Sequence, residues 1–386
     1  MKPFDDPIYV TRPMLPDLDD VNKEIQEIWQ SQWLTNEGMK HKRLEEEIRK
    51  VLKVQEVSLF NNGTIALIVA IQSLGLSCEV MTTPFTFPAT PHVLKWNNIT
   101  PVFCDIDENT LTIDPEKIEK AITAKTTGVL GVHVYGVPCD IKRIQEFADH
   151  HNLKVVYDGA HAFGTEINGV GIGAFGDISM FSFHATKLFH TLEGGALTCN
   201  DPSLKSHIDL LKNFGIKNED EVLMPGINGK MNEIQAAIGL INLRNIETER
   251  SKRKNIIDTY RKNLVGIPGI NIFNLDEGIT NSYQYFVIRI TREFGLSRDE
   301  VQLELKKYNV ITRKYFYPLC SDYSCYRNLP SASRENLPVA SRVVKEVLCL
   351  PLYGALKLVD VESICHIIKE IHANANGKRY YSILQS

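Results

Sequence analysis

Lys187 lies on a polar loop that directly follows an apolar run, in the stretch Phe181-Ser182-Phe183-His184-Ala185-Thr186-Lys187. Gly194 and Gly195 follow a few positions later. A lysine is most often a solvated surface charge. Small and hydroxylated neighbours between two apolar runs instead favour partial burial, which lowers the pKa of an amine and frees it to act as a nucleophile.

Asp158 ends another apolar run, Val155-Val156-Tyr157, 29 positions before Lys187. Ligands of open α/β sheets bind at the carboxyl ends of the strands, where Asp158 is predicted to lie. An aspartate that caps the next turn is the competing interpretation. A nucleophilic amine and a strand-end carboxylate are what pyridoxal phosphate (PLP) requires, because the amine bonds to the cofactor aldehyde and the carboxylate pairs with the protonated pyridine nitrogen.

The stretch Asn61-Asn62-Gly63-Thr64 joins a predicted strand to a predicted helix. Backbone N–H groups at the start of a helix bind phosphate, and here Gly63 allows a close turn while Thr64 adds a hydroxyl. Taken alone, the stretch is better explained as an ordinary helix cap. His161 follows Asp158 by three positions and is within reach of the same cofactor.

Two other patterns fit known motifs less well. Residues 171–176 match the GxGxxG pattern of dinucleotide-binding proteins, but they follow a hairpin-like stretch and lead into a strand rather than a helix. This match is the only support for a nicotinamide-dependent sugar oxidoreductase. Asp105 and Asp107 resemble a carboxylate pair for a metal ion, but a turn that ends a strand explains them better. No metal site is predicted.

The composition is that of an ordinary globular protein, with 386 residues, 43% hydrophobic residues and a net charge of −4. This balance gives no support for binding to nucleic acid or to an anionic membrane surface. Eight cysteines without a CxxC pair favour small buried side chains in a reducing compartment. No run approaches the ~20 apolar residues of a membrane span. We expect a cytoplasmic protein.

Short apolar runs alternate with predicted helices along the first half of the chain, which predicts parallel βαβ units and an α/β sheet covered on both faces. The expected strands are residues 57–60, 80–83, 101–104, 128–134, 153–157 and 178–183. A long helix is expected from Asn232 to about Leu264, before a smaller α+β unit. The predicted organisation is an N-terminal segment (1–38), a large cofactor-binding domain (39–255) and a small C-terminal domain (256–386).

Taken together, these motifs resemble the DegT/StrS family of PLP-dependent sugar-nucleotide aminotransferases. The match runs in order through nearly the whole chain, which makes it far more specific than any single motif. The matching stretches are Trp33-Leu34-Thr35-Asn36, Asn62-Gly63-Thr64, Thr86 to Thr90, Val132 to Gly136, Asp158 to Ala162, Phe181 to Lys187, Glu193-Gly194-Gly195, and Gly226-Ile227-Asn228 through Ala237. The resemblance implies a PLP-dependent transferase of fold type I, with a large, mixed but mostly parallel sheet and a smaller α+β C-terminal domain.

The resemblance also implies roles for individual residues. Lys187 corresponds to the lysine that forms the Schiff base and shuttles the proton, and Asp158 to the partner of the pyridine nitrogen. The other implied cofactor contacts are Phe87 (ring stacking), Gly63, Thr64 and Ser182 (phosphate), His161 (phenolic oxygen), and Asn228, which reaches the phosphate from the neighbouring subunit of a homodimer with shared active sites. The implied substrate-binding set is Trp33, Thr35, Asn36, His184, Arg313, Tyr315 and Tyr317.

The resemblance is strongest to the branch that aminates dTDP-4-keto-6-deoxy-D-glucose with L-glutamate as the donor, in the synthesis of surface polysaccharide (O-antigen). Residues 312–318 lack the histidine common in many relatives, so a 3-keto or UDP-linked deoxysugar is an alternative substrate. An alternative of another class is a sugar dehydratase or a non-catalytic regulator on the same fold. The dehydratase branch has histidine in place of the lysine, and Lys187 argues against it.

Overall fold

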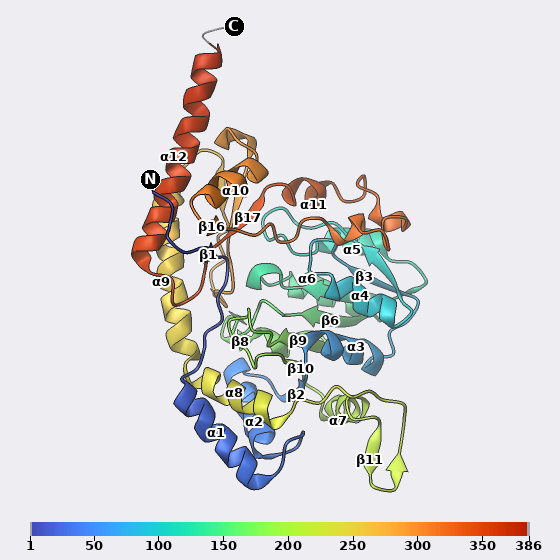
Figure 1. Ribbon diagram of the computed structural model, residues 1–386. Helices are drawn as coiled ribbons and strands as arrows, with labels where there is room; N and C mark the ends of the chain where they lie inside the picture. Colours follow the sequence, from blue (N-terminus) through green and yellow to red (C-terminus); the bar gives the residue numbers. More distant parts are fainter. Residues whose placement is uncertain (1, 384–386) are drawn as a thin grey trace.

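A seven-stranded sheet forms the centre of the molecule (Figure 1), a computed structural model that describes residues 2–383. Its strands are β2 (Glu56–Phe60), β3 (Glu79–Thr82), β4 (Thr100–Phe103), β5 (Thr126–Val132), β6 (Lys154–Asp158), β9 (Ile178–Ser182) and β10 (Gly195–Cys199). They lie in the order β2-β10-β9-β6-β5-β3-β4. Only β10 runs antiparallel to its neighbours in this sheet, so the predicted mixed, mostly parallel sheet is confirmed.

Helices cover both faces of the sheet because successive side chains of its strands point to opposite sides. Val156 packs with one set of helices and its neighbour Val155 with another. The first set is α3 (Gly63–Ser73), α4 (Ala89–Trp96) and α7 (Pro202–Leu211). The opposite face carries α5 (Pro115–Ala121) and α6 (Ile141–His151), together with α2 (Met39–Leu52) and α8 (Glu233–Arg244).

The long helix predicted from Asn232 to Leu264 is two helices in the structure, α8 and α9 (Ile246–Leu264). Asn232 starts α8 with a capping box, in which its side chain accepts from the N–H of Gln235. Asn245 ends α8, with φ −103° and ψ 1°, and its side chain donates to the carbonyl of Ile241 at 3.4 Å. Asparagine favours such breaks because its side chain competes with the helix for backbone partners.

The C-terminal part has a separate core around an antiparallel sheet in the order β13-β15-β17. Its elements are β13 (Ile270–Ile272), β15 (Phe286–Ile290), β17 (Val347–Leu350), α10 (Arg298–Lys307), α11 (Pro338–Val343) and α12 (Leu358–Ile383). Helix α9 crosses the predicted domain boundary, and its residues join this core from Ile256 onward. This agrees with a limit near residue 255, although the domain limits stay a prediction.

Short strands complete the fold. The pairs are β1 (Ile8–Tyr9) with β16 (Val310–Ile311), β7 (Glu166–Ile167) with both β8 (Val170–Gly171) and β14 (Ile279–Thr280), and β11 (Ile216–Asn218) with β12 (Glu221–Val222). The β11–β12 hairpin projects away from the body of the molecule (Figure 1). Helix α1 (Leu18–Ser31), the first helix of the chain, packs against α8. No helix within the described residues is both long and apolar enough to cross a membrane.

The glycines of residues 171–176 serve packing. A Cβ atom at Gly171 would lie 1.8 Å from the carbonyl oxygen of Leu52, and one at Gly173 would lie 2.8 Å from the hydroxyl of Thr198. The stretch leads into strand β9, which is the context expected from the sequence. The glycine pattern therefore needs no bound dinucleotide to explain it.

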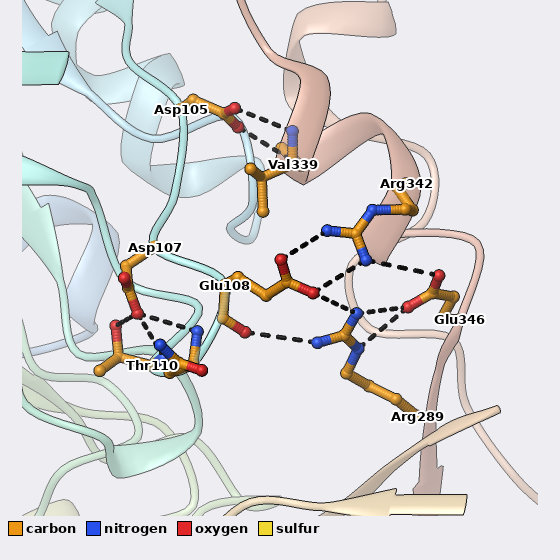
Figure 2. A network of polar contacts seen from close by, with 10 residues as sticks. Asp105, Asp107, Glu108, Thr110, Arg289, Val339, Arg342 and Glu346 are labelled. Carbon is orange, nitrogen blue, oxygen red and sulfur yellow. Dashed lines mark hydrogen bonds and ion pairs between the residues drawn. The ribbon is translucent and has the colours of Figure 1, made fainter. Parts of the chain in front are cut away.

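The carboxylates of Asp105 and Asp107 accept hydrogen bonds from backbone N–H groups (Figure 2). Asp105 is buried and accepts from the N–H groups of Val339 and Ala340, at 2.9 and 2.8 Å, at the start of α11. Asp107 accepts from the N–H groups that follow it in its own turn, including that of Thr110 at 2.9 Å. The bonds of Asp107 confirm the predicted turn, whereas sequence reasoning did not predict that Asp105 caps α11.

A group of ion pairs continues the same connection between the two parts of the chain (Figure 2). Glu108 pairs with Arg342 at 2.8 Å and with Arg289 at 3.3 Å, and Arg289 also pairs with Glu346 at 2.6 Å. An apolar cluster also joins the two parts. It contains side chains of the large sheet and side chains of β15, β17 and residues 316–344. The C-terminal part is thereby fixed against the carboxyl end of the sheet.

Candidate active site

A cavity of about 620 Å³ lies at the carboxyl ends of β6 and β9. These two strands are parallel neighbours, so the residues that follow them emerge at the same edge of the sheet. The wall of the cavity includes seven of the predicted residues: Gly63, Thr64, Phe87, Asp158, His161, Ser182 and Lys187. Two members of the predicted substrate-binding set, His184 and Tyr315, also line it.

Asp158 is buried at the floor of the cavity and is held by two donors. The hydroxyl of Thr90 donates to Oδ2 at 2.8 Å, and the N–H of Ala160 donates to Oδ1 at 3.0 Å. Burial raises the pKa of this carboxyl, while both hydrogen bonds and the charge of Lys187 oppose the rise. Sequence reasoning assigned no role to Thr90, although a hydroxyl in the first turn of α4 is the kind of group that could have suggested one.

Lys187 sits half-buried in the wall of the cavity. Its backbone N–H donates to the carbonyl of His184 at 2.8 Å, which closes a tight turn. Burial lowers the pKa of the Lys187 amine to about 8, against the opposing charge of Asp158. About a tenth of this amine is therefore uncharged, and hence nucleophilic, at pH 7.

His161 has its ring orientation and protonation fixed by the backbone. The N–H of Tyr135 donates to Nδ1 of His161 at 3.2 Å, so a neutral ring carries its proton on Nε2. Burial, followed by the charge of Lys187, holds the pKa of His161 well below its ordinary value. The ring lies parallel to that of Phe316 at 5.6 Å and edge-on to that of Tyr285 at 5.0 Å. His161 is thus a neutral residue with one N–H available as a donor.

The start of helix α3 forms a close-packed cradle at the other end of the cavity. Asn62 caps the helix by accepting from the N–H of Ile65 at 2.8 Å. A Cβ atom at Gly63 would lie 3.2 Å from Cβ of Ser182, and one at Gly195 would lie 2.7 Å from the nitrogen of Gly63. A side chain at position 195 would clash with the backbone of Gly63, so Gly195 permits this approach and leaves the backbone open to an anion at the helix start.

The residues present fit PLP. The start of α3 and Ser182 suit its phosphate, and Asp158 suits its pyridine nitrogen. Phe87 lines the cavity with 57% of its surface exposed, so a flat ring can stack on it. Lys187 offers the amine. Other wall residues that sequence reasoning did not single out include Asn61, Thr86, Glu193, Tyr285 and Phe316.

The remaining predicted residues lie outside the wall of this cavity: Trp33, Thr35, Asn36, Asn228, Arg313 and Tyr317. The ring of Tyr317 lies under the guanidinium of Arg298, at 5.4 Å. Asn228 is exposed, and its carbonyl accepts from the side chain of Asn61 at 3.4 Å. These six residues therefore do not line the cavity of one chain, although Asn228 lies next to its wall through Asn61.

The fold and the pocket together define a PLP-dependent transferase of fold type I. The chain belongs to the DegT/DnrJ/EryC1/StrS aminotransferase family, which matches residues 17–369. It is 49% identical to a dTDP-4-amino-4,6-dideoxy-D-glucose transaminase of Escherichia coli, over 94% of this chain and 98% of that protein. A Shigella dysenteriae transaminase of the same name is 44% identical, over 95% and 99%.

The solved structures lead to the same family. The structure of DesI in the presence of its TDP-sugar product superposes with a TM-score of 0.92 at 33% identity, and covers 100% of this chain and 97% of that one. Helicobacter pylori PseC, an aminotransferase of pseudoaminic acid biosynthesis, gives a TM-score of 0.88 at 27% identity, with coverage of 96% and 100%. The expected fold class, enzyme class and cofactor are thereby confirmed.

Proposed function

We propose that this enzyme transfers the amino group of L-glutamate to dTDP-4-keto-6-deoxy-D-glucose and so makes dTDP-4-amino-4,6-dideoxy-D-glucose. The observation that carries the proposal is one cavity that holds Lys187, Asp158 and Phe87 beside the start of α3. The specific sugar rests on the two transaminases of this name that are 49% and 44% identical over almost the whole chain. A role in surface polysaccharide synthesis and a cytoplasmic location are parts of the same proposal.

Two residues of the cavity, Asp158 and Lys187, have definite tasks in this reaction. PLP, when bound, supplies an electron sink for the carbon that carries the amino group. Asp158 remains charged and keeps the pyridine nitrogen protonated, helped by its two donors. The Lys187 amine removes the proton from the amino-acid carbon as a base and later returns a proton as an acid. A pKa of about 8 suits both steps, because each protonation state is accessible near neutral pH.

We infer that the enzyme acts as a homodimer in which each chain completes the other's site. The turn Trp33–Asn36 and the segment that holds Asn228 are near neighbours, since the carbonyl of Leu34 accepts from the N–H of Glu233 at 3.2 Å. Trp33, Leu34, Thr35 and Asn228 are exposed on their own chain, and Asn36 is half-buried. Beside them, residues 214–227 expose five large apolar side chains, Phe214, Ile216, Val222, Leu223 and Ile227. Apolar surface gathered in this way is typical of an interface.

The amino transfer is tested with Lys187→Ala. The control is Lys154→Ala, at the start of β6 and away from the cavity. Lys154 is a surface lysine that pairs with Asp177 at 3.1 Å. We expect Lys187→Ala to hold PLP weakly and to lose turnover by orders of magnitude, while Lys154→Ala stays close to wild type. Normal conversion of glutamate to 2-oxoglutarate by Lys187→Ala would refute the assignment. A panel of dTDP-, UDP- and GDP-linked keto sugars then identifies the acceptor.

The shared site is tested by subunit complementation between Lys187→Ala and Asn228→Ala. If Asn228 serves the partner's cavity, a mixed dimer contains one doubly altered site and one intact site. Random mixing of the two inactive proteins should then restore roughly one quarter of the wild-type activity, because half of the dimers are mixed and each has one good site. No recovery on mixing, with mixed dimers verified by mass spectrometry, would mean that Asn228 acts in its own chain or not at all.

A further inference from the structure

Gln284 lies directly against the loop that carries Lys187 and has only 2% of its surface exposed. Its Oε1 accepts from the N–H of Leu188 at 2.6 Å, and its Nε2 donates to the carbonyl of Thr186 at 3.1 Å. One side-chain amide thus binds the backbone immediately before and immediately after Lys187. We propose that Gln284 is a positioning residue that fixes the place of the Lys187 amine, an inference that rests on the proposed function of the site.

The segment that carries Gln284 also holds the turn that follows Asp158. The hydroxyl of Ser282 donates to the carbonyl of His161 at 2.6 Å, and the N–H of Gln284 donates to the same hydroxyl at 3.3 Å. Ser282 fits there because Gly136 lacks a side chain, since a Cβ atom at Gly136 would lie 2.4 Å from its hydroxyl oxygen. Residues 282–284 therefore connect the lysine loop to the turn that carries His161.

Helix α9 anchors this segment. Arg250 donates to the carbonyl of Asn281 at 3.0 Å, and Arg253 donates to that of Tyr283 at 3.5 Å. Arg253 is itself buried and held by Glu249 at 2.7 Å. Because the 19-residue helix α9 holds the backbone on both sides of Ser282, we expect Gln284 to have a fixed position relative to the lysine loop.

The lysine loop needs this support because the regular hydrogen bonds of a helix or a sheet do not hold its backbone. Residues 183–194 are neither helix nor strand. Leu188 and Phe189 anchor the loop in the apolar core, and Phe189 stacks on Phe163 at 4.6 Å. This packing holds the loop against the core. The two hydrogen bonds to Gln284 hold the backbone on either side of Lys187, and so set the direction of its side chain.

The test is the rate at which Lys187 becomes covalently bound to PLP when PLP is added to the apoprotein. In that step the Lys187 amine adds to the aldehyde carbon and water leaves. Reduction with borohydride and mass spectrometry of the Lys187 peptide give a readout that does not depend on turnover. A displacement of about 1 Å at a reacting group costs about 100-fold, so we expect Gln284→Met to slow attachment by about that factor.

A matched control is Gln302→Met. Gln302 also donates its side-chain amide to a backbone carbonyl, that of Thr312 at 3.2 Å, but it lies on α10 and not in the cavity wall. We expect this variant to attach PLP at the wild-type rate. Circular dichroism and the melting temperature of each apoprotein show whether it is folded.

Gln284→Glu gives a second, independent reading. A protonated glutamate has the donor and acceptor of glutamine, whereas a charged one repels the carbonyl of Thr186. The attachment rate of Gln284→Glu, expressed relative to wild type, should therefore rise as the pH falls. A merely structural defect gives no such dependence.

Two results overturn the inference: wild-type attachment by folded Gln284→Met, or a rate of Gln284→Glu that is slower than wild type by a factor that does not change with pH. If wild-type protein itself does not attach PLP at Lys187, the proposed function fails instead. The two failures are distinguished in the same experiment.

Discussion

Replacing Thr90 with valine removes one hydroxyl from the active site and keeps the shape of the side chain. The Thr90 hydroxyl donates to Asp158 at 2.8 Å, and both residues are buried. A hydrogen bond to a charged group contributes about 1.5–3 kcal/mol. Because about 1.4 kcal/mol corresponds to a tenfold change in rate, the loss predicts a reaction slower by about 10- to 100-fold.

The neighbouring hydroxyl adds to this effect. Thr86 and Thr90 share a hydrogen bond of 2.9 Å, and since Thr90 gives its own proton to Asp158, Thr86 donates to Thr90. Such chains polarise one another in a low-dielectric interior, which strengthens the bond to the carboxylate. Valine at position 90 also leaves the buried hydroxyl of Thr86 without this partner. The expected loss therefore lies toward the upper end of the range.

The assay is the single-turnover rate at which glutamate converts enzyme-bound PLP to its aminated form. Thr90→Ser retains the donor and should remain within a few-fold of wild type. Thr198→Val is the matched control, because Thr198 is a buried threonine that donates to the carbonyl of Gly173 at 2.7 Å away from the cavity. A Thr90→Val rate within twofold of wild type, or an equal loss in Thr198→Val, would refute the reasoning.

The pH dependence of the Thr90→Val rate shows whether the Thr90 hydroxyl acts by stabilising the charged form of Asp158. Burial already raises the pKa of Asp158, and the Thr90 bond opposes the rise. Without that bond the neutral form of Asp158 is favoured further, so the pKa rises again. The rate of Thr90→Val should therefore fall with decreasing pH over a range in which the wild-type rate is still constant. Parallel pH profiles would mean that Thr90 acts on something other than the charge of Asp158.

Two further predictions concern Lys187 and Asp105. Because burial lowers the pKa of Lys187 to about 8, the amine is half uncharged at that pH and nearly all uncharged about one pH unit above it. Covalent attachment of PLP should therefore accelerate with pH through about 8 and level off about one unit higher. A stopped-flow rate that keeps rising toward pH 10.5 would contradict the burial argument. Asp105→Ala leaves two N–H groups at the start of α11 without their acceptor and should lower the free energy of unfolding in urea by about 1–3 kcal/mol. A loss below the error of the measurement would show that water replaces the carboxylate.

The two central residues could be predicted because each follows a short apolar run that only a buried strand explains. Asp158 is the last residue of β6, and Lys187 lies five positions beyond the end of β9, the parallel neighbour of β6. The pattern of apolar residues indicates both strands. Their supporting residues could not be predicted in the same way. Thr90 is 68 positions from Asp158, and Gln284 is 96 positions from Leu188. A hydrogen bond over such a separation leaves no local pattern in a single sequence.

The direction of β10 and the break between α8 and α9 illustrate the same limit. The apolar run at Ala196-Leu197 does not reveal that its strand returns antiparallel between β9 and β2. The buried residues of α8 continue smoothly toward α9, so only the geometry of Asn245 marks the break. Likewise, the residues implied to bind the sugar nucleotide are split between one chain's cavity and exposed surface. A sequence does not say which copy of the chain each of them serves.

Asp158 and Lys187, the two proposed catalytic residues, are held by different parts of the fold, and this predicts different sensitivity to change. Asp158 is the last residue of β6 and pairs in register with Met180 of β9, so the ladder of the sheet itself locates it. Lys187 lies seven positions beyond Met180, within the loop of residues 183–194. Its position depends on side chains that come from residue 284 and on the apolar anchors beside it. Substitutions near residues 281–284 should therefore displace the amine while leaving the carboxylate in place, which separates loss of the covalent bond to PLP from loss of its pyridine contact.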